Sequence, residues 1–119
     1  MGLVIVFADR DKARREIQEK VLDKPCIYVI KKGEEILYVG STSNCRQRLM
    51  KHLIYMNKES SILIKHIVER GLNPERVLLG SVIYVEYCED EVVCREREKE
   101  VISFLKPKFN VRYNKKNLS

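Results

Sequence analysis

The chain has 119 residues, of which 45% are hydrophobic and 34% charged, as is ordinary for one globular domain. No apolar run approaches the roughly 18 residues of a membrane span, and the run at residues 3–7 is too short for a signal-peptide core, so we expect an intracellular protein without membrane contact. The formal net charge of +6 suits a polyanionic partner such as a nucleic acid, although a solvated basic surface would account for it equally well.

The first part of the chain predicts a helix followed by a β-hairpin. Residues 3–7 could form a strand or lead into a helix. Residues 9–22 have apolar positions at helical spacing, and an aspartate near their start can cap the helix. Two β-rich runs, at residues 26–31 and 35–40, flank a turn that contains Gly33, which predicts that they pair as a hairpin.

The second part predicts three helices and one long strand. Helices are expected over residues 44–56, from Ser60 or Ser61 to residue 70, and over residues 90–106. The β-branched run at residues 77–87 predicts a central strand between the last two helices. This order predicts an α+β fold with a small, mainly antiparallel three-stranded sheet flanked by helices.

The chain contains four cysteines, Cys26, Cys45, Cys88 and Cys94, and none of them forms a Cys-x-x-Cys pair. Without that spacing, and without a secretory signal, we expect reduced thiols and no zinc site.

Glu98 interrupts the apolar stripe of the last predicted helix, which consists of Cys94, Val101, Ile102 and Leu105. A carboxylate that faces a core is costly unless it is paired or binds a metal ion. One interpretation is that Glu98 lies at the helix edge or pairs with Arg48 or Arg95. The other is that it is an oxygen ligand for magnesium, which takes one or two carboxylates and keeps water and phosphate as its other ligands.

Two further pairs of residues are candidates for phosphate chemistry. Arg48 and His52 lie four residues apart on one helix face, where a guanidinium could hold a phosphate through two hydrogen bonds. A solvated basic helix face is the more common reason for such a pair. Tyr28 and Tyr38 lie on the two strands of the hairpin and could bring two hydroxyls together, or they could simply stack across the sheet.

Taken together, these residues resemble the GIY-YIG nuclease family. The match covers roughly residues 25–112, and the closing segment, residues 98–110, has the family's glutamate, apolar pair, Leu-x-Pro and asparagine. The other shared elements follow in the family's order and spacing: Cys26-Ile27-Tyr28, Tyr38-Val39-Gly40, Ser41-Thr42, Arg48, His52 and Ser60-Ser61-Ile62.

The resemblance implies a single domain over residues 1–119. Within it, residues 1–24 would be an N-terminal extension with a helix, residues 25–112 the GIY-YIG-like nuclease core and residues 113–119 a basic polar tail. Cys26 replaces the first glycine of the family motif. If that position needs a positive φ, the first strand of the hairpin would be distorted.

The resemblance also implies roles for six catalytic residues. Glu98 would bind one divalent ion, Mg²⁺ or Mn²⁺. Tyr28 or its partners would help position or deprotonate the attacking water, and Tyr38 would line the same site as nucleophile activator or phosphate contact. Which group is the general base stays open, because a tyrosine needs a strongly shifted pKa to act near neutral pH. Arg48 would stabilise charge on the phosphate. His52 would accept a proton or a hydrogen bond, and Asn110 would support the site through its side chain.

The expected partner is DNA, with RNA left open. Two segments, residues 36–58 and 106–119, contain basic residues and no acid. With the glycine and serine of the second motif they supply the residues expected to contact nucleic acid: Gly40, Ser41, Arg46, Lys51, Lys106, Lys108, Arg112, Lys115 and Lys116. Family members commonly carry a separate DNA-binding module, and we expect none in these 119 residues. This suggests low intrinsic sequence specificity, or specificity supplied by a homodimer or a partner protein.

We therefore predict a metal-dependent endonuclease that hydrolyses DNA in repair, in a mobile element or in restriction. The alternatives are a nucleic-acid-binding module with the same fold but no activity, and a small basic scaffold in which the tyrosines and Glu98 are only structural.

Overall fold

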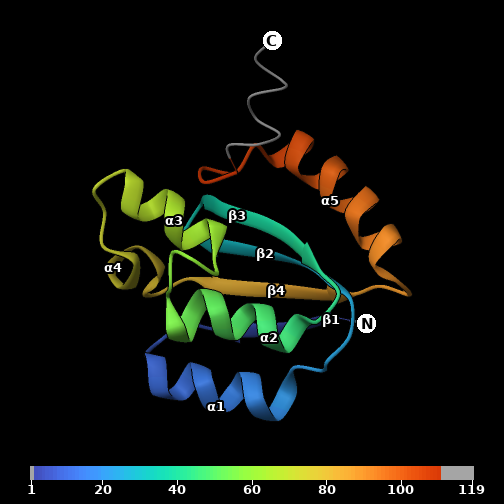
Figure 1. Ribbon diagram of the computed structural model, residues 1–119, viewed down its shortest axis with the longest axis horizontal. Coiled ribbons are helices and arrows are strands. Elements are labelled where there is room, and N and C mark those ends of the chain that lie inside the picture. Colours follow the sequence, from blue (N-terminus) through green and yellow to red (C-terminus); the bar gives the residue numbers. More distant parts are fainter. Residues whose placement is uncertain (1, 111–119) are drawn as a thin grey trace.

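The computed structural model describes residues 2–110 (Figure 1). Four strands and five helices follow one another, with a π-helical turn directly after α2. In chain order they are β1 (Gly2–Val6), α1 (Arg10–Lys20), β2 (Cys26–Lys32), β3 (Glu35–Thr42), α2 (Cys45–Met50), the π-turn (Lys51–Tyr55), α3 (Ile62–Glu69), α4 (Pro74–Leu78), β4 (Val82–Tyr87) and α5 (Glu91–Leu105).

The strands form one antiparallel sheet in the order β1-β4-β2-β3. The predicted α+β class and antiparallel sheet are confirmed, but the predicted number of three strands is wrong. The apolar run near the N-terminus forms the fourth strand, β1, which pairs with β4. The expected N-terminal extension therefore contributes an edge strand to the sheet.

Polar side chains start the helices where the sequence predicts. Asp9, Asn44, Ser61 and Asp90 each accept a hydrogen bond from a backbone N–H group of the helix that follows. The strand predicted over residues 77–87 is confirmed only from Val82 onward. Its first part belongs to α4, because Asn73 caps that helix and Pro74 occupies its first turn.

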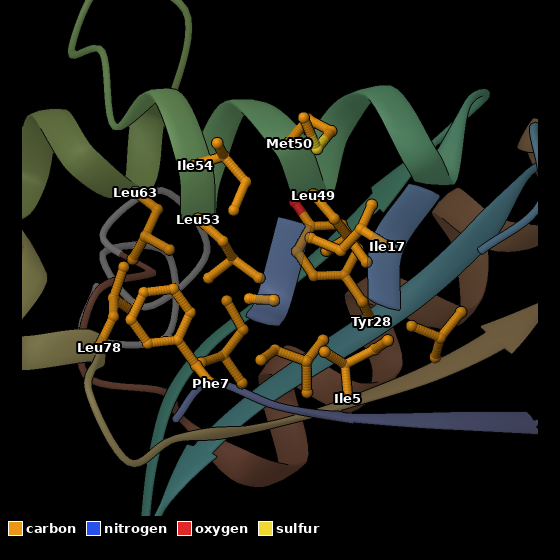
Figure 2. Packing of buried hydrophobic residues seen from close by; sticks show 14 of the residues in the cluster. Ile5, Phe7, Ile17, Tyr28, Leu49, Met50, Leu53, Ile54, Leu63 and Leu78 are labelled. Atoms are coloured by element: carbon orange, nitrogen blue, oxygen red, sulfur yellow. The ribbon is translucent and has the colours of Figure 1, made fainter. Parts of the chain in front are cut away.

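Helices cover both faces of the sheet. Figure 1 shows α1 and α2 on one side of the strands and α5 on the other. The larger core lies beneath α1, α2 and α3 and includes Phe7, Ile17, Leu49 and Leu53, which Figure 2 shows packed against the sheet. A smaller core lies beneath α5 around Ile102. Within the described residues, no helix is long and apolar enough to cross a membrane.

The outer edge of β3 is covered by the segment that follows α5. The backbone N–H of Lys108 donates to the carbonyl of Ile36 at 3.0 Å, and that of Phe109 donates to the carbonyl of Leu37 at 2.9 Å. These bonds satisfy edge groups that would otherwise be free to pair with another strand. They also fix the end of α5 against the strand that carries the second tyrosine motif.

A disulfide joins Cys88, just after β4, to Cys94 in α5. The expectation that all four thiols are reduced is therefore wrong for this pair. The chain turns sharply at Asp90, and this turn places the two Cα atoms 5.7 Å apart. Cys26 and Cys45 are free and buried.

Candidate active site

The site starts at a close contact between β2 and β3. Tyr28 lies directly opposite Gly40 in the register of the two strands, and its ring crosses the glycine. A Cβ atom on residue 40 would overlap the Tyr28 hydroxyl and would lie 2.5 Å from its Cζ atom. Gly40 is therefore needed to make room for the tyrosine. The sequence analysis also expects Gly40 to contact nucleic acid, and that role stays a prediction.

From Gly40, Tyr28 reaches a buried histidine. The Tyr28 hydroxyl lies 2.6 Å from Nε2 of His52, and Nδ1 of His52 lies 2.6 Å from Oγ of Ser61. Ser61 also accepts the N–H of Ile64 at 3.1 Å and thereby caps α3. The orientation of Tyr28 is thus tied to the start of α3. In the sequence Ser61 is recognisable only as a helix cap, so its contact with His52 could not be predicted.

His52 is neutral in the folded protein. Burial, and then the positive charges of Arg48 and Lys51, lower its pKa to about 3. One ring nitrogen therefore carries a proton and donates a hydrogen bond, and the other nitrogen accepts a hydrogen bond. Burial also raises the pKa of Tyr28 well above its usual range, with a further contribution from Tyr38. The Tyr28–His52 pair is accordingly an uncharged hydrogen-bonded unit.

We expect His52 to make the fold sensitive to acid. Its pKa is lower in the folded than in the unfolded state, so below about pH 6.5 the unfolded chain takes up a proton that the folded chain does not. The free energy of unfolding should fall with decreasing pH by up to about 1.4 kcal/mol per pH unit from this group. Urea unfolding between pH 4.5 and 7.5 measures the effect. His52→Gln should flatten the slope, and an equal slope in the wild-type and variant proteins would contradict the assignment.

The second tyrosine lies beside the first. The ring centres of Tyr38 and Tyr28 are 6.2 Å apart, and the Tyr38 ring meets His52 edge-on at 5.6 Å. Tyr38 is only partly buried. Burial and the nearby carboxylate of Glu98 raise its pKa to about 12. Tyr38 is therefore protonated at neutral pH in the ion-free protein.

Glu98 enters the site from α5. Its Oε1 atom accepts a hydrogen bond of 2.8 Å from the hydroxyl of Ser41, at the end of β3. The predicted placement on the inner face of the helix is confirmed, because Cys94 and Ile102, four residues away on either side, are buried. Glu98 itself is half-buried.

These side chains line one cavity of about 410 Å³. Five of the six predicted catalytic residues border it, and His52 lies behind Tyr28. The lining residues are Tyr28, Tyr38, Gly40, Ser41, Arg48, Ile62, His66, Arg95, Glu98, Phe109 and Asn110. The elements that build the cavity are β2, β3, α2, α3, α5 and the segment after α5.

Two of the polar lining residues, His66 and Arg95, were not among the predicted site residues. From the sequence, His66 would be a surface residue on its helix without a partner, and this expectation is wrong. Its Nδ1 donates to the carbonyl of Phe109 at 2.9 Å, which ties α3 to the segment after α5. Arg95 was considered only as an ion-pair partner for Glu98. It lies three residues before Glu98, and that spacing on a helix was the available signal.

The donors in the cavity fit a magnesium ion better than a zinc ion. Residues 2–110 contain no group of three or more His, Cys, Asp or Glu side chains placed to hold a metal. The cavity offers one carboxylate, Glu98, with the hydroxyls of Tyr38 and Ser41 in its lining. Magnesium accepts such a site because it retains water and binds substrate phosphate.

The residues expected to contact nucleic acid are dispersed. Gly40 and Ser41 line the cavity. The guanidinium of Arg46 instead donates to the carbonyl of Val21 at 2.8 Å and pairs with Asp23 at 3.1 Å, joining α2 to the end of α1. Lys51 and Lys106 are not among the residues that line the cavity, and Lys108 pairs with Glu35 at 3.7 Å. Arg112, Lys115 and Lys116 lie outside the described residues, as does the tail over residues 113–119.

Asn110 holds the segment after α5 against β3. Its side chain accepts the N–H of Val39 at 2.8 Å and donates to the carbonyl of Val39 at 2.7 Å, and both residues are buried. The sequence predicted that the side chain of Asn110 would support the site, and these two hydrogen bonds to the backbone of Val39 are a way for it to do so.

Asn110→Ala is expected to lower the free energy of unfolding by about 2–5 kcal/mol, because it leaves a buried N–H and a buried C=O without partners. Denaturant unfolding measures this loss. The control is Asn73→Ala, which removes only the exposed cap of α4 and should cost about 1 kcal/mol. Similar losses in the two variants would contradict the role of Asn110.

The family is shown by a comparison with family models. The model of the GIY-YIG catalytic domain matches residues 24–114. The chain belongs to the GIY-YIG family. Among curated proteins, this GIY-YIG domain resembles UvrABC system protein C of Fervidobacterium nodosum, with 30% identity over 95 residues. It also resembles the protein of the same name from Thermosipho africanus, with 21% identity over 91 residues.

The matched regions make up 80% and 71% of this chain but only 15% and 16% of the two relatives. Among solved structures, the GIY-YIG N-terminal endonuclease domain of UvrC from Thermotoga maritima, bound to magnesium, is similar with a TM-score of 0.59. The identity is 19%, and the match covers 82% of this chain and 94% of that one. A point mutant of the same domain gives a TM-score of 0.57 at 18% identity. At these identities the structures establish the fold.

Cys26 does not disturb the start of the GIY-YIG hairpin, whose one register shift lies further along, between Ile30 and Lys31. It pairs with Thr42 on one side and with Tyr87 on the other, and its φ is not positive. The distortion of this strand that a positive φ at residue 26 would have caused therefore does not occur. A hydrogen bond from the thiol to Cys45, together with burial, raises the pKa of Cys26 far above its usual range. The thiol therefore stays protonated and unreactive within the core.

Proposed function

We propose that the protein is a metal-dependent endonuclease that hydrolyses phosphodiester bonds in DNA. The observation that carries the proposal is the cavity in which Tyr38, Arg48 and Glu98 come together from three different elements. A tyrosine, an arginine and a carboxylate around one open space can respectively orient water, hold a phosphate and bind a cation.

The reaction is in-line attack of water on phosphorus. A P–O bond to water forms and the bond to the leaving sugar oxygen breaks. The attacking water gives up a proton and the leaving oxygen takes one up, so the products are a phosphate monoester and a sugar hydroxyl. Arg48 donates hydrogen bonds to the phosphate oxygens and stabilises the charge that develops on them. Ser41 orients the carboxylate of Glu98 through its hydrogen bond.

Glu98 is the residue that would hold Mg²⁺. The bound ion would stabilise charge on the leaving oxygen and would offset the negative charge that raises the pKa of Tyr38. Magnesium in the related endonuclease domain of Thermotoga maritima supports this assignment.

Tyr38 is better placed than Tyr28 to face the attacking water. Tyr28 is 2% exposed and its hydroxyl is engaged with His52, whereas Tyr38 is partly exposed in the cavity. We assign Tyr28 and His52 the task of fixing the position of Tyr38, which both of their rings contact.

Cleavage assays on labelled plasmid and branched DNA, with magnesium, manganese or EDTA, test the proposal. We expect nicking with either metal and none with EDTA. If the protein bound DNA but did not cleave it under any of these conditions, the nuclease proposal would be wrong and the protein would be an inactive binding module. The form of DNA that is cut most readily would point to the pathway. A cleavage rate that rises more steeply than in proportion to protein concentration would indicate a homodimer.

A further inference from the structure

A second, smaller cavity adjoins the candidate active site. It has a volume of about 230 Å³ and shares Ser41, Arg48 and Arg95 with the first cavity. It extends the site along the loop between β3 and α2 and towards the start of α5, where Glu91 lies. The shared residues make the two cavities neighbouring parts of one groove.

The residues that line this second cavity are all polar or charged, with two guanidinium groups, three hydroxyls and the carboxylate of Glu91. An aromatic base would find little apolar surface there, whereas a phosphate would find donors. The loop is already ordered, because the hydroxyl of Thr42 donates to the carbonyl of Asn44 at 3.2 Å and accepts its N–H at 3.1 Å. A ligand would therefore not have to order the loop on binding.

Arg95 is the more exposed of the two positive charges in this part of the groove, since Arg48 is partly buried. The Arg95 side chain is 55% exposed and pairs with Glu91, one helical turn away, at 3.2 Å. Exposed pairs of this spacing contribute little to stability. The guanidinium can consequently exchange the carboxylate for a phosphate with only a small loss.

We propose that Arg95 binds the DNA phosphate next to the one that is cut. The inference rests on the proposed nuclease function and adds a subsite to it. Arg48 and Arg95 both line the two cavities, whereas Glu98 lines only the first. The cleaved phosphate would therefore occupy the first cavity beside Glu98, and the neighbouring phosphate the second cavity against Arg95. Arg95 would thereby set which phosphate of the strand enters the cleavage position.

The test compares Arg95→Gln with Arg97→Gln in a Glu98→Gln background that is expected to bind but not cut. The two arginines are well matched, because Arg97 is 52% exposed, lies on the same helix and pairs with Glu86 at 3.0 Å on β4. DNA affinity is measured over a range of salt concentrations. Arg95→Gln should weaken binding about tenfold and lower the salt slope by about one. Arg97→Gln should change both values little.

A neutral methylphosphonate beside the mapped cleavage position identifies the contact. On that DNA, Arg95→Gln should bind as well as the protein that keeps Arg95, whereas on unmodified DNA it should not. Equal behaviour of the two arginine variants, while the wild type still cuts DNA, would overturn the subsite and leave the nuclease proposal intact. A wild-type protein that neither cuts nor binds DNA would overturn both.

Discussion

Replacement of Glu98 by glutamine is expected to abolish metal-dependent DNA cleavage and to leave the fold intact. The amide oxygen can still accept the hydrogen bond from Ser41, so the substitution keeps that contact and removes the charge that is proposed to hold the cation. A metal ion supplies several kcal/mol of transition-state stabilisation, which at about 1.4 kcal/mol per factor of ten corresponds to a loss of roughly 10³-fold or more. The cleavage rate at saturating magnesium measures the loss.

Glu100→Gln is the matched control, because Glu100 lies two residues further along α5 and is exposed. It should cut DNA at the wild-type rate. Thermal melting of the Glu98→Gln protein separates the alternatives. Loss of activity with an unchanged melting temperature supports the cation site, whereas a large fall in melting temperature would favour a structural role. Full activity in Glu98→Gln would rule out Glu98 as the ligand.

Gly40→Ala is expected to damage both stability and activity. The added methyl group would occupy the space of the Tyr28 ring, so the ring must move and its hydrogen bond to His52 must break. Overpacking and the loss of one buried hydrogen bond together should lower the free energy of unfolding by about 2–5 kcal/mol. Denaturant unfolding measures the stability, and the plasmid assay should show a matching loss of cleavage.

A double-mutant cycle isolates the cause of that loss. In a Tyr28→Ala background the space above residue 40 is empty, so Gly40→Ala should then cost much less than it does in the wild-type protein. If the cost were the same in both backgrounds, the clash with Tyr28 could not be its origin. The loss would then arise from the strand itself.

Local signals predicted most of the site. The positions of Tyr28 and Tyr38 follow from a hairpin whose two strands and turn are visible in the sequence. Glu98 stood out because it breaks an apolar stripe, and helix starts were predictable because a capping side chain contacts the helix within three residues. Each of these signals depends on residues that are close together in the chain.

The rest depends on contacts between distant segments. The apolar run near the N-terminus forms β1 (Gly2–Val6) only because β4 offers an edge, and a short apolar run does not by itself reveal that partner. The Cys88–Cys94 disulfide depends on the angle between β4 and α5. His66 and Arg95 belong to the site because of the segments that pack opposite them. The spacing of apolar residues along a helix does not indicate which segment will pack there.

The position of α5 relative to β3 has a consequence for how the protein is made. The Ser41–Glu98 bond spans 57 residues of chain, and the contacts of Asn110 with Val39 span 71. Contacts at such separations form late, because a long loop must close before they contribute. During synthesis the hairpin and α2 therefore emerge with Tyr28, Tyr38 and Arg48 but without the cation ligand. The proposed cleavage site is therefore assembled only when α5 and the segment after it pack against β3, and a chain made only as far as β4 would lack it.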